Sequence, residues 1–279
     1  MKNLIPYNEN CFKVHVDAVN KKHSGDLKDR LLSLNDTIKN DYDIFEHNFS
    51  INELLNLIPN PELTSSKEDL LTLYNYNSSV IFNLREKIRN LQIRTIHTTC
   101  QFCTIDTVNT LDHILPKSKY PEFIVHPKNL IPCCPTCNSI KTDSSYNENK
   151  NEFLNLYLDI LPDIQYLFVN ISKDENEEID FSYYLNNVNN KIPLPLYDLI
   201  VSHHIKLNLL NRMKLKAIEY FDDFKNTIAV FRNTLSIDEI IKHLLEIVSL
   251  NQIAYGINNW KCVLELSLLQ SSIFKDTFK

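Results

Sequence analysis

Two closely spaced cysteine pairs restrict most strongly how this chain can fold. The pairs are Cys100 with Cys103 and Cys134 with Cys137, each separated by two residues. A C-x2-C pair places two thiolates on one tight turn, and two such pairs complete the tetrahedral coordination of zinc. Because four protein ligands leave no open position for a substrate, such a site is structural rather than catalytic. The sequence therefore predicts a structural Zn2+ that closes residues 104–133 into a loop.

The other three of the seven cysteines are expected to play lesser parts. Cys133 adjoins the second pair and is an alternative ligand to Cys134, but the two-residue spacing favours Cys134. We expect Cys133 in the local core or beside the metal's ligands. Cys11 and Cys262 stand alone in apolar surroundings, which is typical of small core residues.

Compartment and membrane association follow from similar patterns. Clustered cysteines bind metal more often than they form disulfides in the cytosol. Residues 1–10 have no apolar core of the signal-peptide type, and no apolar run approaches the roughly 18 residues that span a bilayer. The expectation is a cytoplasmic protein without a membrane partner.

Polar residues in a distinctive order lie between and just after the cysteine pairs. Asp112 and His113 are adjacent, Asn129 follows later in the loop, and Asn138 comes directly after the last paired cysteine. This order resembles the HNH endonuclease family, whose shared core is called ββα-metal. His113 matches the first H and Asn129 the N, while Asn138 takes the third position, usually His, as in the HNN variant. The resemblance covers roughly residues 97–143.

The resemblance implies a metal-dependent endonuclease that hydrolyses DNA. Hydrolysis of a phosphodiester requires a deprotonated water and charge stabilisation at the phosphoryl and leaving oxygens. His113 suits the general base because a neutral histidine titrates near the working pH. By resemblance, Asp112 and Asn138 hold a divalent metal, and Asn129 orients His113 and braces the loop. These oxygen ligands suit Mg2+ or Mn2+.

Each of these residues also has a purely structural interpretation. An Asp-His pair occurs in turns, Asn129 is a common turn residue, and Asn138 could cap the following helix. Their joint spacing, threaded through the cysteine pairs, favours the nuclease. A noncatalytic zinc-knuckle module that binds nucleic acid or protein explains the cysteines but not the four polar residues. A helical interaction protein with a zinc staple is a third hypothesis.

Positive charge gathers around the predicted site. Residues 85–143 hold eight Lys and Arg against five Asp and Glu, a net charge of +3, whereas the whole chain carries −6. Lys117, Lys119 and Lys141 are the predicted phosphate contacts, with solvated surface lysines as the alternative. No base-reading element such as a helix-turn-helix is evident, so we expect weak sequence preference. An acidic chain also suggests a protein partner or activating signal that brings it to DNA.

Outside the cysteine-rich segment, apolar residues recur mostly at helical spacing. Only two glycines occur, which excludes a Rossmann fold or a P-loop. The predicted fold is mostly α (α+β), with helical terminal regions around a small zinc-stapled ββα-metal module and one extra β-hairpin. The predicted domains are residues 1–95, 96–146 and 147–279. Helices are expected at 26–45, 65–90, 207–231, 236–248 and 258–270, and hairpin strands at 165–171 and 179–185.

Biological role is inferred from the resemblance alone. Stand-alone HNH proteins with unfamiliar flanking regions resemble effectors of bacterial anti-phage defence or restriction. The flanking helices would then serve regulation or partner docking. Double-stranded DNA, single-stranded DNA and RNA all stay open as substrates.

Overall fold

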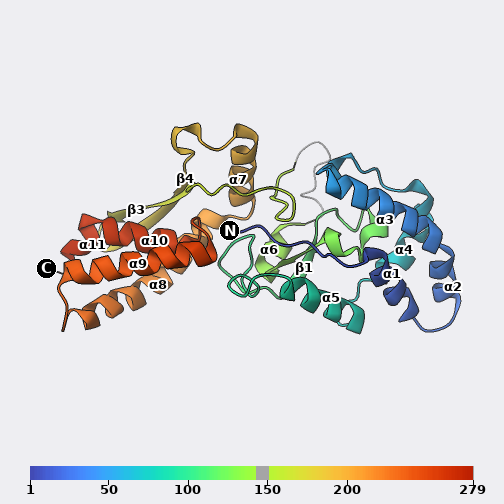
Figure 1. Ribbon diagram of the computed structural model, residues 1–279, viewed down its shortest axis with the longest axis horizontal. Coiled ribbons are helices and arrows are strands. Elements are labelled where there is room, and N and C mark those ends of the chain that lie inside the picture. The colour runs from blue at the N-terminus through green and yellow to red at the C-terminus, as the bar shows by residue number, and fades with distance from the viewer. Residues whose placement is uncertain (143–150, 279) are drawn as a thin grey trace. The chain divides into compact units, whose positions relative to one another are not determined.

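The computed structural model describes residues 1–142 and 151–278, and these residues are mostly helical (Figure 1). Eleven α-helices and two small antiparallel sheets, each of two strands, occur among them. This confirms the predicted mostly-α, α+β fold class. No helix in the described ranges has both the length and the hydropathy to cross a membrane.

The described residues divide into two compact units. The predicted boundaries at residues 95 and 146 stay predictions, and residues 143–146, including Asp143 of the charge count, lie outside the described ranges. The first unit consists of Asn3–Gln101 and Thr107–Ile160, and the second of Met1–Lys2, Phe102–Asp106 and Leu161–Lys279.

Amphipathic helices form most of the first unit. Helix α3 (Asn35–Ser50) buries Tyr42 and Phe45, and α5 (Ser79–Asn90) buries Ile81 and Leu84, each on one face. This spacing of apolar residues is what makes a helix pack against a core. The remaining helices of this region are α1 (Cys11–Asn20), α2 (Asp26–Ser33), α4 (Lys67–Leu71) and the 3-10 turns η1 (Leu54–Asn56) and η2 (Pro61–Ser66).

Two predicted helices are interrupted. The helix expected at 26–45 is two helices that meet at Leu34. The helix expected at 65–90 is also two, because an Asn-rich turn separates α4 from α5. Asn75 accepts from the Asn77 backbone N–H at 3.0 Å, and Ser78 caps α5 by accepting from the Ile81 N–H at 3.2 Å. Such local side-chain bonds compete with the helical backbone pattern, so the apolar spacing alone was misleading here.

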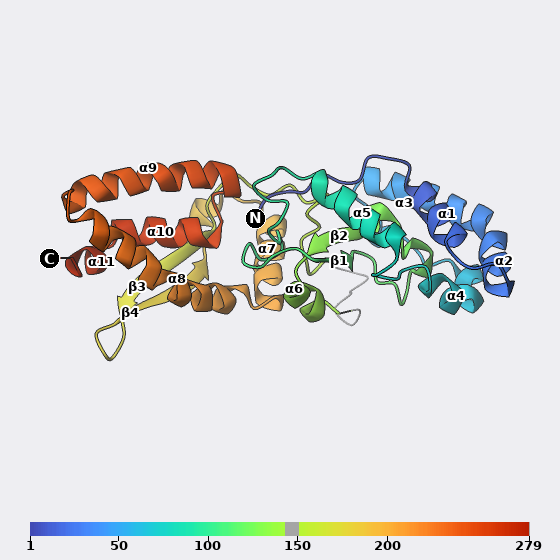
Figure 2. The ribbon, with the colours of Figure 1, turned by 90° about the horizontal axis from the view of Figure 1, so that it is seen from below.

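A small ββα arrangement follows these helices (Figure 2). Strand β1 (Thr110–His113) pairs antiparallel with β2 (Leu130–Cys133), with Thr110 opposite Cys133 and His113 opposite Leu130. Helix α6 (Pro135–Ile140) follows β2 directly and packs against β1. Between the strands lie η3 (Pro121–Phe123) and η4 (Pro127–Asn129). Asp112 and His113 therefore lie at the end of β1, and Asn138 lies in α6.

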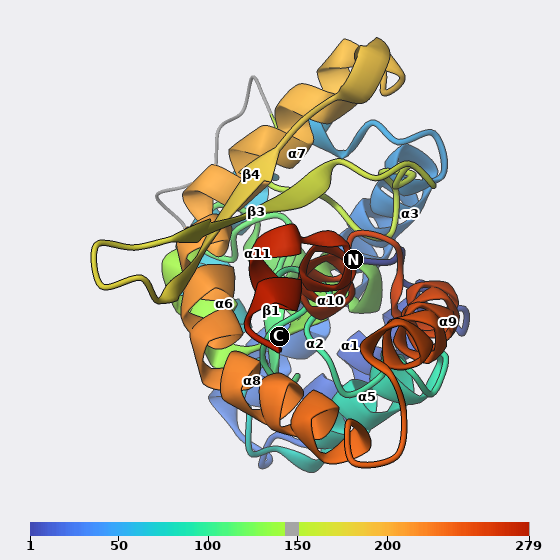
Figure 3. The same ribbon diagram turned by 90° about the vertical axis from the view of Figure 1, so that its left-hand side faces the viewer.

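The second unit packs a β-hairpin against helices. Strand β3 (Leu167–Lys173) pairs with β4 (Ile179–Leu185), which confirms the predicted hairpin. Helix α10 (Trp260–Gln270) is central, because it contacts β3, α8 and α9 (Figure 3). The other helices are α7 (Leu194–Lys206), α8 (Leu209–Phe231), α9 (Ile237–Tyr255) and α11 (Ser272–Asp276), with the 3-10 turn η6 (Val188–Asn190).

Candidate active site and zinc cluster

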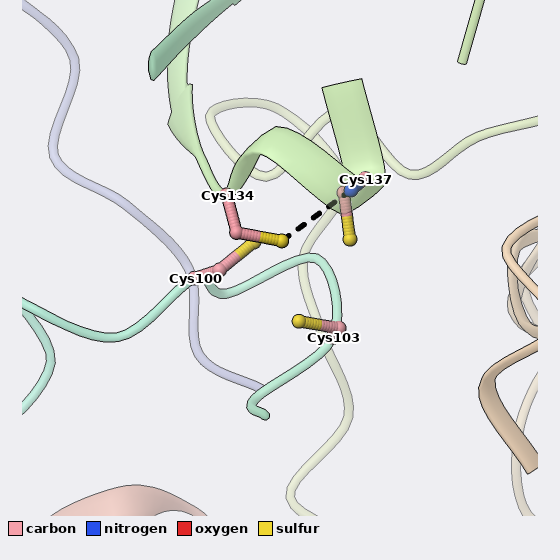
Figure 4. Close-up of side chains that lie close together, drawn as sticks. All are labelled: Cys100, Cys103, Cys134 and Cys137. Atoms are coloured by element: carbon pink, nitrogen blue, oxygen red, sulfur yellow. Dashed lines mark hydrogen bonds between the residues drawn. The ribbon is translucent and has the colours of Figure 1, made fainter. Parts of the chain in front are cut away.

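The four paired cysteines converge as the spacing predicts (Figure 4). Their sulfur atoms all lie within 4.8 Å of one another, and all four residues are buried. Cys134 is the N-cap of α6, and its sulfur accepts from the Cys137 backbone N–H at 3.3 Å. The sulfur of Cys103 accepts from the Ile105 N–H at 3.4 Å in the same way. Both knuckles thus direct backbone N–H groups at sulfur.

The donor set of this cluster fits zinc. None of the four cysteines is in a disulfide, and four converging thiolates are the ligands of a closed structural zinc site. Cys133 lies outside the cluster, on β2, where its sulfur is 3.2 Å from the Thr110 hydroxyl oxygen. The choice of Cys134 over Cys133 from the spacing therefore agrees with the geometry.

Asp112 and His113 end strand β1 and are both buried. His113 Nε2 lies 2.9 Å from the Ile124 carbonyl oxygen. Because a carbonyl only accepts, Nε2 must carry the proton of this hydrogen bond. Nδ1 is then the ring nitrogen that can accept a proton. The ring of Tyr74 stands edge-on to the imidazole at 4.9 Å between centroids.

Asn129 lies at the end of η4 and is fully buried. Its Oδ1 accepts from the Leu115 N–H at 2.7 Å, and its Nδ2 donates to the carbonyls of Leu115 and Phe123, both at 3.1 Å. Phe123 precedes Ile124, whose carbonyl holds His113. Asn129 thus braces the loop after β1 and is linked to the His113 ring through Phe123 and Ile124.

Lys141 lies just beyond α6 and points back to β1. Its Nζ is 2.7 Å from Asp112 Oδ2 and 2.7 Å from the His113 carbonyl oxygen. Asn138 is half-buried on α6, the helix that packs against β1. The packing of α6 on β1 brings the elements that carry Asp112 and Asn138 together.

Residues 100–144 match the model of the HNH endonuclease family. The chain contains an HNH domain. The match begins at the first paired cysteine and includes β1, β2 and α6. It accounts for the ββα arrangement and for the order of the polar residues in one segment.

Sequence similarity to a phage protein covers more of the chain than the HNH domain. "Protein ea31" of Escherichia phage lambda is 27% identical over 192 residues, which cover 63% of this chain and 62% of that protein. The aligned region thus spans less than two thirds of the relative. No solved structure matches the chain.

Lys117 and Lys119 lie in the turn that follows β1 of the HNH domain. Lys117 is exposed and Lys119 is half-buried, with its ammonium 5.7 Å from the centre of the Tyr120 ring. Of the three predicted phosphate contacts, Lys117 is the exposed one, whereas Lys141 contacts Asp112. The three lysines therefore do not share one environment.

Sequence reasoning missed two tyrosines beside the HNH strands. The Tyr74 hydroxyl donates to the Leu111 carbonyl at 3.2 Å, and the Tyr76 hydroxyl donates to the Asn109 carbonyl. Burial raises the pKa of Tyr74 above its usual value, so it is neutral. Both residues fall in the turn between α4 and α5, which was expected to be helical. The neighbouring asparagines were the signal for this turn.

Proposed function

We propose that the HNH domain is a metal-dependent endonuclease that hydrolyses DNA, with His113 as the general base. The observation that supports this best is the hydrogen bond from His113 Nε2 to the Ile124 carbonyl. It fixes the tautomer in which Nδ1 can remove a proton from water.

The acidic and amide side chains fit a divalent ion. We assign the metal to the Asp112 carboxylate and the Asn138 amide oxygen, hard donors that suit Mg2+ or Mn2+. Asp112 already attracts a cation, since Lys141 Nζ lies 2.7 Å from its Oδ2. A metal bound there would polarise the scissile phosphate and stabilise the leaving 3′ oxygen.

The remaining residues position the base and the substrate. Asn129 holds Leu115 and Phe123, and this network keeps the Ile124 carbonyl in place beneath His113. Lys117 and Lys119 would contact phosphates that flank the scissile bond. Asn129 is therefore a positioning residue, whereas the two lysines contribute salt-dependent affinity.

A role in anti-phage defence or restriction, with a partner or signal that activates cutting, remains our proposal for the biological context. This proposal rests on the resemblance of stand-alone HNH proteins to such effectors. A cytoplasmic location, where phage and host DNA meet, agrees with this proposal. The helices outside the HNH domain would then bind the partner.

The competing function is a zinc-knuckle module that binds DNA without cutting it. The two are separated by incubation of the purified protein with supercoiled plasmid in Mg2+, in Mn2+ and in chelator. The endonuclease predicts nicked or linear plasmid with either ion and intact plasmid in chelator. A binding module predicts a retarded but intact plasmid under every condition.

A further inference from the structure

A second cluster of metal-binding side chains lies away from the four paired cysteines, in the first unit. Cys11 begins α1, Glu46 lies in α3, and His126 is the residue before η4. One ligand atom of each lies within 4.8 Å of the other two. Cys11 is 6% exposed and His126 0%. Three segments that are far apart in sequence thus bring a thiol, a carboxylate and an imidazole together inside the fold.

Two polar atoms of this cluster lack the hydrogen bonds that burial demands. His126 Nε2 and Glu46 Oε1 are buried and have no hydrogen-bond partner among the described residues. They are 3.5 Å apart, which is too long for a good hydrogen bond. Two ligands on one tetrahedral zinc, with bonds of about 2.1 Å, stand roughly 3.4 Å apart. Buried polar groups without partners call for an explanation, and an ion supplies one.

We propose that Cys11 Sγ, Glu46 Oε1 and His126 Nε2 bind a second Zn2+. Thiolate, carboxylate and imidazole are the three ligand types that zinc takes in proteins. A thiolate and a carboxylate together balance the charge of the ion. Three protein ligands leave a fourth position, which water fills.

The surroundings hold two of the ligands in place. Lys128 donates to the second oxygen of the Glu46 carboxylate, Oε2, so Oε1 is left for the metal. The aromatic rings of Tyr42 and Phe45 pack on His126 with centroids at 4.3 and 4.0 Å. Outer contacts of this kind orient metal ligands.

Two contacts change when the metal binds. The Cys11 thiol donates to the Glu9 carbonyl at 3.7 Å, and it must lose this proton to bind the metal. His126 Nδ1 accepts from the Lys128 backbone N–H at 3.3 Å, whereas a metal on Nε2 puts the ring proton on Nδ1. The contact is longer than a normal N–H hydrogen bond, so little stability is lost with it. The alternative is a metal-free cluster of neutral imidazole, thiol and carboxylate, and the experiment below distinguishes the two.

The second zinc would tie the helical region to the HNH domain's loop. It joins α1 and α3 to the start of η4, and η4 ends at Asn129. The significance of this link for catalysis rests on the proposed function. The existence of the site does not, because metal content is measured without any cleavage assay.

The test counts zinc in the full-length protein, purified without chelator and dialysed against buffer that contains a slight excess of Zn2+, then against metal-free buffer. Inductively coupled plasma mass spectrometry should find two zinc ions per chain. Cys11→Ser, Glu46→Gln and His126→Gln should each hold one. Cys262→Ser, a buried cysteine in α10, is the matched control and should hold two.

A second measurement covers variants that fold poorly. Replacement of zinc by Co2+ gives absorption bands that report thiolate ligands, and Glu46→Gln should lose one cobalt while circular dichroism stays unchanged. Glu46 is partly exposed, so this substitution is the mildest of the three. One zinc per wild-type chain, or two in all three variants, would overturn the proposal.

Discussion

Lys141 and Asp112 form an ion pair at the edge of the HNH domain, with 2.7 Å between Nζ and Oδ2. The same ammonium lies 2.7 Å from the His113 carbonyl oxygen. A lysine that contributes only to phosphate affinity would be expected to face solvent. Here it neutralises the carboxylate that we assign to the metal. On that assignment, Lys141 and the metal would compete for Asp112.

Substitution of Lys141 should accordingly tighten metal binding. Loss of a charge-assisted contact worth about 1.5 kcal/mol corresponds to a roughly ten-fold higher Mn2+ affinity for Lys141→Gln. Free Mn2+ can be followed by electron paramagnetic resonance. Lys117→Gln, in the exposed turn nearby, should bind Mn2+ like the wild type. Unchanged or weaker binding by Lys141→Gln would show that the lysine does not compete.

Removal of the Asn129 side chain should destabilise the protein. Asn129→Ala leaves the Leu115 N–H and the carbonyls of Leu115 and Phe123 without the bonds they have now. The expected loss in the free energy of unfolding is about 3 kcal/mol, measured by urea denaturation. Asn138→Ala, on the half-buried face of α6, should lose much less. Equal losses would argue against a bracing role for Asn129.

Zinc at the paired cysteines can be tested on two adjacent residues. Cys134→Ser should lose the zinc of the four-cysteine cluster, whereas Cys133→Ser should keep it, because only Cys134 belongs to that cluster. Metal content is again the measurement. Zinc retained in Cys134→Ser and lost in Cys133→Ser would reverse the ligand assignment.

Glu122 should make stability depend on pH. Burial raises its pKa from 4.5 to about 7, and the side chain is 1% exposed. Between these values the folded state keeps a proton that the unfolded state releases, so the stabilisation is complete below about pH 4.5 and declines as pH rises through 7. The urea midpoint of Glu122→Gln should therefore change less than that of the wild type between pH 5 and pH 8. Glu62→Gln, at an exposed position, is the control. If the urea midpoint of Glu122→Gln depends on pH as steeply as that of the wild type, the raised pKa of Glu122 is contradicted.

Features set by neighbours in sequence could be predicted well. The C-x2-C spacing identified the four converging cysteines, since each pair shares a single turn. The helix expected at 236–248 begins at a capping box of Ser236 and Glu239 at the start of α9. Two apolar, aromatic runs on either side of an acidic loop likewise predicted the β3–β4 hairpin. In each case the decisive contacts lie within a few residues.

Features that depend on distant contacts could not be predicted. Helix α1 was missed because its buried face is short, and it becomes meaningful only where Cys11 meets Glu46 and His126. The approach of Lys141 to Asp112 likewise depends on how α6 packs against β1. The spacing of residues along the chain does not predict contacts between residues that are far apart in sequence.

The central claim is tested most directly by the rate at which His113→Ala nicks supercoiled plasmid in Mn2+. The variant should be matched to the wild type in zinc content and compared with His243→Ala, which removes an exposed histidine of α9. Loss of a general base predicts a rate lower by about 10²- to 10⁴-fold for His113→Ala, with His243→Ala unchanged. Cleavage by His113→Ala at the rate of the wild type would contradict the assignment of His113 as the base.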